Sequence, residues 1–183
     1  IASAAQTSDL TQWQNSAGTN VAAMTPSGIL NVYDIRTSGV DVWLGKNAIG
    51  QANYATVAIG VNAVAWGTNG VAIGNTANAD PHNATSIGGY SRVWDDNGTA
   101  LGNYAQARNG NGVAIGMAAE SNSGGVTIRR AANAGVTGGG GTGAIAIGYN
   151  ADAVGFNAIA IGRDASSPGP CGIAIGKGAV THD

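Results

Sequence analysis

The chain has 183 residues, a formal net charge of −2 and 31 glycines, and only 10% of its residues are charged. Its few basic side chains are scattered, which excludes the clustered cationic surface that nucleic-acid binding needs. One cysteine excludes an internal disulfide framework and a cysteine-rich metal site. With so much glycine and a single Phe, the composition predicts a thin or shared core.

Residues 1–41 differ in pattern from the rest of the chain. Two short alternating stretches, 10–14 and 20–25, are followed by a third at 29–35, with turn-forming residues between them. This pattern predicts a β-meander, and we expect residues 1–41 to form an N-terminal connector module. The chain opens at Ile1 without an initiator Met or a signal-peptide pattern, so we interpret it as a fragment.

From residue 42 onward a 14-residue repeat dominates the chain. The tripeptide AIG, or a close relative of it, ends at glycines that recur every 14 residues: Gly60, Gly74, Gly88, Gly102, Gly116, and again Gly148, Gly162, Gly176. The segment 126–129 fits the rung missing between these two runs, with Arg129 in the glycine slot. The extra residues then fall in a Gly-rich insertion near 131–143. With Gly45 as the first anchor, residues 42–183 hold ten rungs.

Each rung predicts two short strands and two corners. Branched apolar residues stand one and three places before the glycine, with a small residue between them, which predicts a strand buried on both sides. Small residues three and five places after the glycine predict a second strand. Asn-Gly pairs suit the closing corner, and stacked Asn side chains can bond from rung to rung. We therefore expect a narrow β-roll whose Ala-lined outer face packs against copies of itself.

The repeat resembles the head repeat of YadA-like trimeric adhesins. The segments VAIGVNAVAWGTNG, VAIGNTANADPHNA and AIAIGRDASSPGPCG carry this resemblance, which extends over about residues 42–183. It implies an all-β fold, a left-handed parallel β-roll (solenoid) of about ten 14-residue rungs in a side-by-side homotrimer. It also implies surface binding rather than catalysis. Trp43, in an Ala slot, and Arg129 depart from the pattern.

The N-terminal phrase LTQWQNSAGTNVAAMTPSGIL resembles a short module of phage tail-fibre and virion appendage proteins. Together the two resemblances favour an adhesive trimeric segment of a phage tail fibre or virion appendage that attaches to a host surface. Its expected partners are two further copies, a host cell-surface glycan or protein, and other virion or fibre proteins. The alternative is the head domain of a bacterial trimeric autotransporter adhesin, located at the bacterial cell surface.

One column of the repeat suggests a binding stripe. The sixth residue after the glycine is variable, which predicts that it faces solvent, and Tyr90 and Tyr104 form a neighbouring column. Aromatic rings with carboxylates and amides can hold sugar rings and hydroxyls. The column runs Trp66, Asp80, Trp94, Arg108, Asn122. The competing interpretation is that the two Trp side chains cover the roll edge or a groove between chains.

A second candidate is the insertion, where Arg129 and Arg130 could form a projecting contact loop; the alternative is a tolerated surface insertion. We expect no enzyme activity, because the adjacent Asp95 and Asp96 do not form a catalytic carboxylate pair. This argues against a polysaccharide-degrading tailspike. An ice-binding solenoid is disfavoured because its Thr residues fall at different repeat positions. We expect no cofactor, no metal, no nucleic-acid partner and no membrane insertion.

Overall fold

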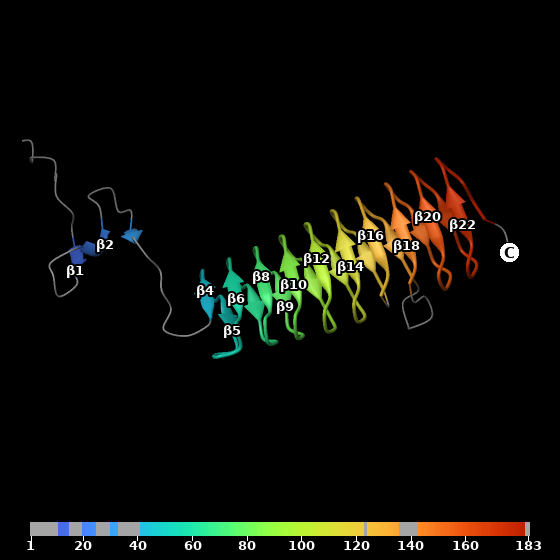
Figure 1. Cartoon of the computed structure of the whole chain (residues 1–183). Coiled ribbons are helices and arrows are strands. Elements are labelled where there is room, and N and C mark those ends of the chain that lie inside the picture. Colours follow the sequence, from blue (N-terminus) through green and yellow to red (C-terminus); the bar gives the residue numbers. More distant parts are fainter. Residues whose placement is uncertain are drawn as a thin grey trace, which may run out of the picture. The chain divides into compact units, whose positions relative to one another are not determined.

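The computed structural model describes residues 11–14, 20–24, 30–32, 41–122, 124–135 and 143–181. The chain divides into two compact units, Ile1–Ser38 and Gly39–Asp183. In the first unit, β1 (Thr11–Gln14), β2 (Asn20–Met24) and β3 (Leu30–Val32) form a three-stranded antiparallel sheet (Figure 1). The predicted meander is therefore confirmed in these strands.

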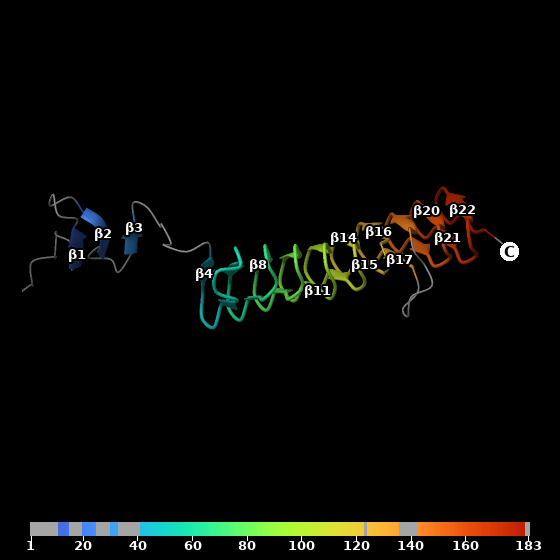
Figure 2. The ribbon, with the colours of Figure 1, turned by 60° about the horizontal axis from the view of Figure 1, so that its bottom comes forward.

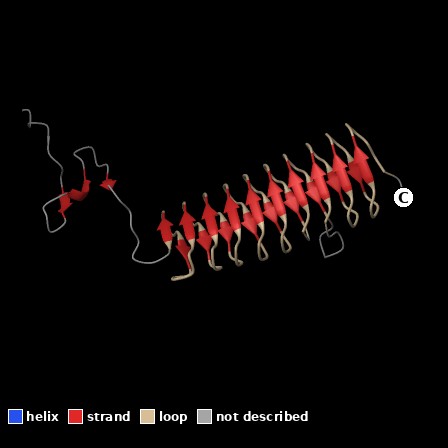
Figure 3. Cartoon of the chain, viewed as in Figure 1, coloured by secondary structure: helices blue, strands red, loops and turns tan. Residues whose placement is uncertain are grey.

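The second unit is a parallel β-solenoid, as the β-roll pattern predicts (Figures 2 and 3). Its first sheet has ten strands: β4 (Val42–Leu44), β6 (Val57–Ile59), β8 (Val71–Ile73), β10 (Thr85–Ile87), β12 (Thr99–Leu101), β14 (Val113–Ile115), β16 (Val126–Ile128), β18 (Ile145–Ile147), β20 (Ile159–Ile161) and β22 (Ile173–Ile175). Its second sheet has nine: β5 (Ile49–Gly50), β7 (Val64–Ala65), β9 (Asn78–Ala79), β11 (Arg92–Val93), β13 (Gln106–Ala107), β15 (Glu120–Ser121), β17 (Asn133–Ala134), β19 (Asp152–Ala153) and β21 (Ser166–Ser167).

Strand β16 confirms the rung that the sequence places at 126–129. It pairs in parallel with β14 on one side and β18 on the other, in the same register as its neighbours. Residues 136–142 of the Gly-rich insertion lie outside the described residues. The ladder of the first sheet therefore runs unbroken from β4 to β22, whatever path the insertion takes.

The interior of the roll is lined by small side chains. The middle residue of a first-sheet strand points inward, and from β6 to β22 it is Ala, Ser or Thr and buried, as at Ala72 and Ala114. Small residues of the second sheet, such as Ala79 and Ala107, meet them from the other side. The two sheets are so close that the interior has no room for a larger side chain at most rungs.

This interior overturns the expectation of an Ala-lined outer face. The branched residues that flank each inward Ala point outward, and none of them is buried in the single chain. Ile87 is 38% exposed and Ile115 36%, and at the end of the roll Ile175 is 65% exposed. The strands are thus buried on one side only. We call the outward side chains of β4–β22 the first-sheet face.

The anchor glycines allow successive corners to stack closely. A Cβ built on Gly74 would lie 2.5 Å from the carbonyl oxygen of Gly88, and the φ of Gly74 is +137°. Arg129 occupies the same slot with a φ of 102°. The Gly148 N to Ile128 O hydrogen bond is 3.0 Å there, against 2.7 or 2.8 Å at the other corners. The Arg129 Cβ is thus accommodated by a wider step to the next rung.

Asn side chains at the second corner bond from rung to rung, as predicted. Asn69 Nδ2 donates to Asn83 Oδ1 at 3.0 Å, and Asn83 Nδ2 donates to Asn97 Oδ1 at 3.1 Å. All three residues have positive φ angles, which Asn tolerates better than most residues. The ladder therefore ties together corners whose backbone only Asn and Gly adopt readily.

Trp43 can stand in a slot that holds a small residue in the other rungs because it lies in the first strand of the ladder. β4 pairs with β6 alone, so the inward side of Trp43 is not enclosed by a preceding rung, and the side chain is 40% exposed. Its Nε1 donates to Thr56 Oγ1 at 3.0 Å. The Asp41 carboxylate accepts hydrogen bonds from the backbone N–H groups of Thr56 and Asn53 and from the Thr56 hydroxyl. These groups close the N-terminal end of the roll.

The glycine slot generates a first prediction about the free energy of unfolding, which urea unfolding at one protein concentration measures. Gly74→Ala should lower the free energy of unfolding by about 2 kcal/mol or more, because its Cβ would strike backbone. Arg129→Gly should raise it by about 1 kcal/mol, because it relieves strain. Gly110→Ala is the control, since its Cβ would meet nothing closer than 3.7 Å. An unchanged or lower stability of Arg129→Gly would contradict this account.

The N-terminal closure generates a second prediction. The backbone N–H of Thr56 is the main cause that holds the pKa of Asp41 below its ordinary value. The stabilisation is therefore complete above pH 4 and is lost as the pH falls through the lowered pKa. Asp41→Asn should lower the Tm at pH 7, and the difference in Tm between this variant and the unaltered chain should shrink toward pH 2. Asp80→Asn serves as control; an Asp41→Asn difference that stays constant across this range would exclude the carboxylate as the cause.

Candidate binding face

The outward side chains of the second sheet form the variable surface of the roll, which we call the second-sheet face. In the regular rungs they stand two, four and six places after the anchor glycine, while the residues between them are inward and mostly buried. Contacts join these columns: Asn78 Nδ2 donates to Asp80 Oδ2 at 3.0 Å, and the Arg92 guanidinium lies 3.6 Å from the Trp94 ring centroid. These contacts join the columns four and six places after the glycine. The column two places after it lies in the corner before each second-sheet strand and borders the same face, because Asn150 and Asp152 line one hollow.

Aromatic and cationic residues gather on two adjacent rungs of this face. Tyr90 and Tyr104 stack with their ring centroids 5.0 Å apart and their planes 5° apart. Trp94 is 47% exposed and has Arg92 over its ring, while the Arg108 guanidinium lies 5.9 Å from the same ring. Arg108 also pairs with Glu120 at 2.7 Å.

The structure brings most of the predicted stripe together. Trp94 and Arg108 lie on adjacent rungs in one column, Asp80 precedes Trp94, and Trp66 lies one rung further, 45% exposed. Tyr90 and Tyr104 are on the same face but are not in the next column, because the column of Arg92 and Gln106 stands between them and Trp94. A binding role for these residues stays a prediction.

Asn122 is the member of the predicted column that the structure removes from it. Its side chain is 1% exposed, and its Nδ2 donates to the carbonyl oxygen of Gly135 at 3.3 Å. The step from Gly116 to Arg129 is one residue shorter than the regular repeat. The shortened corner turns Asn122 inward, so the prediction that it faces solvent is wrong.

Arg92 is the residue of this cluster that the sequence interpretation missed. It is exposed and lies between the aromatic columns. Its column reads Val64, Asn78, Arg92, Gln106, Glu120, which is as variable as the column of the Trp residues. Variability at the fourth place after the glycine was the signal that could have identified it.

Arg129 and Arg130 belong to the ordinary corner that follows β16 rather than to a projecting loop. The Arg129 N–H donates to Ile115 O at 2.7 Å, like the other anchor residues. The Arg130 guanidinium lies 5.6 Å from the Tyr149 ring centroid. Both arginines are exposed, and their role as contact residues stays a prediction.

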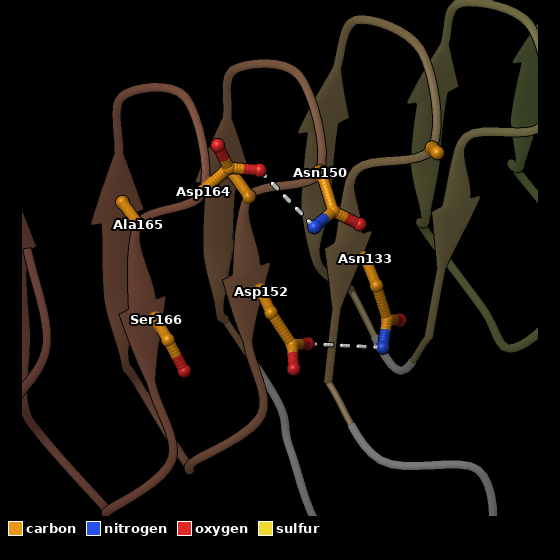
Figure 4. A pocket seen from close by; sticks show the side chains of 8 residues that line it. Asn133, Asn150, Asp152, Asp164, Ala165 and Ser166 are labelled. Atoms are coloured by element: carbon orange, nitrogen blue, oxygen red, sulfur yellow. Dashed lines mark hydrogen bonds between the residues drawn. The ribbon is translucent and has the colours of Figure 1, made fainter. Parts of the chain in front are cut away.

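A hollow of about 370 Å³ lies on the second-sheet face beyond these arginines (Figure 4). Asn133 Nδ2 donates to Asp152 Oδ1 at 3.1 Å, and Asn150 Nδ2 donates to Asp164 Oδ1 at 3.3 Å. The side chains here are short, and the Asn150 N to Arg130 O bond is 3.2 Å, the longest of its kind. The widened step after Arg129 therefore borders the hollow.

Asp152 is a partly buried carboxyl group of the hollow. Burial raises its pKa, and the hydrogen bond from Asn133 partly offsets this effect. Asp164 pairs instead with Arg163, at 3.4 Å. Within the described residues, no three His, Cys, Asp or Glu side chains gather closely enough to hold a metal ion. Nor does that part of the chain contain a helix able to cross a membrane.

The environment of Asp152 generates a third prediction. Because its pKa is raised, the folded state is favoured by this carboxyl below about pH 4 and loses that advantage as the pH rises through the raised pKa. Asp152→Asn should therefore raise the Tm at pH 7 and leave it unchanged at pH 3. Thermal melts at both pH values check this, with Asp80→Asn as the matched control. A Tm that falls at pH 7 would show that the ionised carboxylate is needed.

Comparison with known families agrees with this repeat geometry. A family model described as the YadA head domain repeat (2 copies) matches residues 53–77, 67–91, 95–119, 140–165 and 153–179. These segments cover more than half of the chain and leave out residues 1–52, 92–94, 120–139 and 180–183. No curated protein matches the chain significantly. With its parallel solenoid and 14-residue rungs, the chain belongs to the YadA head domain repeat family.

Proposed function

We propose that this chain is part of the head of a bacterial trimeric autotransporter adhesin. In this proposal three copies form left-handed rolls that pack side by side along their first-sheet faces. The second-sheet faces then point outward and attach the fibre to a surface, without catalysis. The family match supports the adhesin class and a bacterial cell-surface location.

The observation that carries this proposal is the uncovered first-sheet face. Its outward side chains are Val, Ile or Leu in every strand except for Thr85 and Thr99, and none is buried. Soluble monomers rarely expose a continuous apolar surface of this extent. Completing the burial of a partly exposed Val or Ile contributes roughly 0.5–1 kcal/mol, and partly exposed side chains of this kind recur at every rung. Identical copies offer the matching ladder at the same spacing.

The family match favours this bacterial head over the virion appendage that the first 41 residues suggest. The virion interpretation depends on the phrase at residues 10–30, and the family matches begin only at residue 53. A host receptor is a partner under either assignment, whereas other virion or fibre proteins are partners of the virion appendage alone. The attachment function proposed here depends on the repeat and its faces, not on the N-terminal phrase.

Native mass tests the trimer directly. Sedimentation equilibrium of the full chain should give three times the mass of one chain over a range of concentrations. Ile73→Glu with Ile115→Glu should reduce this mass, because two charges on each chain would be buried between copies. Asn78→Glu with Gln106→Glu is the matched control on the second-sheet face, and it should remain trimeric.

A second readout covers the case in which the Ile variants fail to fold. The Tm of the unaltered chain should rise with protein concentration, since association stabilises only the folded state. A folded monomer with a Tm independent of concentration would refute the shared apolar face.

A further inference from the structure

We propose that the second-sheet face around β11 and β13 binds a neutral saccharide. The site consists of Arg92 and Gln106 at its centre, Trp94 on one side, the Tyr90–Tyr104 stack on the other, and Asp80 beside Trp94. This inference deepens the proposed attachment function and rests on it, because the face must point outward from the fibre.

The two tyrosines occupy a position where the fold does not need them. Both have left-handed backbones, with φ angles of 57° and 58°, which bulky side chains adopt at a cost. The same place in the next two rungs holds Ala118 and Ala131, and these corners have the same conformation. The two tyrosines remain 50% and 51% exposed, and their rings pack against each other rather than into the interior of the roll. A stacked aromatic platform at this cost suggests a binding role.

The other side of the site combines an aromatic ring with available hydrogen-bond donors. Arg92 stacks on Trp94, and within the described part of the chain it forms no ion pair, whereas Arg108 is held by Glu120. The Arg92 N–H groups are therefore not committed to a carboxylate. Gln106 is the directly paired neighbour of Arg92 on β13 and adds an amide.

The spacing of these groups suits a short run of sugar rings. Side chains two places apart on a strand are about 6.6 Å apart, which sets the spacing of Arg92 and Trp94. Tyr90 lies in the corner just before β11 and continues this row. Aromatic faces pack against the C–H faces of sugars, and guanidinium, amide and carboxylate groups bond to hydroxyls.

Charge decides between neutral and acidic saccharides. Asp80 lies in the rung before Trp94, and Asp95 and Asp96 directly follow Trp94. All three carboxyl groups are exposed, and their negative charge outweighs the single uncommitted guanidinium. An anionic chain such as a sulfated polysaccharide or a nucleic acid would be repelled, whereas the carboxylates can accept hydrogen bonds from neutral sugar hydroxyls.

A panel of immobilised neutral and acidic oligosaccharides tests the site with the full chain. We expect binding to neutral members. Tyr90→Asn with Tyr104→Asn should weaken this binding at least tenfold, and so should Trp94→Ala. Asn suits the left-handed corner, so the tyrosine variant should keep its Tm and native mass. Phe156→Ala removes an equally exposed ring elsewhere on the roll and should bind as the unaltered chain does.

Three results would overturn the inference: no binding to any neutral saccharide, binding to acidic members alone, or unchanged binding by the tyrosine and Trp94 variants. Cell attachment separates this inference from the proposed function. Periodate oxidises vicinal diols on cell-surface sugars and should abolish attachment. A trimer that attaches equally before and after periodate would retain the adhesin function and reject the saccharide. A folded monomer would reject the trimeric head itself.

Discussion

The narrow interior of the roll determines the rest of the structure. Two sheets of two- and three-residue strands face each other across a space that Ala and Ser fill, as Ala72, Ala79 and Ala114 show. Alanine burial contributes little free energy per residue, because only a methyl group leaves water. The large apolar side chains must therefore stand outside. The hydrophobic stabilisation that a globular domain gains within one chain is here available only at a surface, which is why the first-sheet face dominates the proposed assembly.

The sequence predicts the fold well because the narrow interior imposes the same residue pattern on every 14-residue rung. Each anchor glycine is required by the carbonyl group of the next corner, and the period of these glycines locates every strand of the first sheet. It locates even β16, where Arg129 replaces glycine. Alternation alone, however, says only that Ala and Ile lie on opposite faces of a strand. Which of them is inside depends on the distance between the sheets, and that distance is a property of the closed roll. For this reason the sequence pattern places the Ala column of the first sheet on the wrong side.

The candidate site is less predictable, for a different physical reason. The fold constrains the column two places after the glycine only to a left-handed backbone and leaves the columns four and six places after it free to vary, so their residues show no pattern that marks function. Repeat spacing places Trp66, Asp80, Trp94 and Arg108 in one column, but it does not show that Arg92 stacks on Trp94. Asn122 departs from this column because one residue is missing from its turn. A local change of length has a larger effect than a change of residue type, since it redirects a side chain from solvent to the interior.

These two kinds of column separate stability from recognition. Glycine, alanine and the branched residues hold each rung to its neighbours and, in the proposed trimer, to other chains. The second-sheet face can then exchange an aromatic pair for the hollow around Asp152 within a few rungs while the ladder of hydrogen bonds continues. A substitution on that face alters what the rod contacts but leaves its interior unchanged. In a fibre of three identical chains each such cluster would be present three times, and weak individual contacts would become strong attachment wherever the target surface is dense enough to engage more than one.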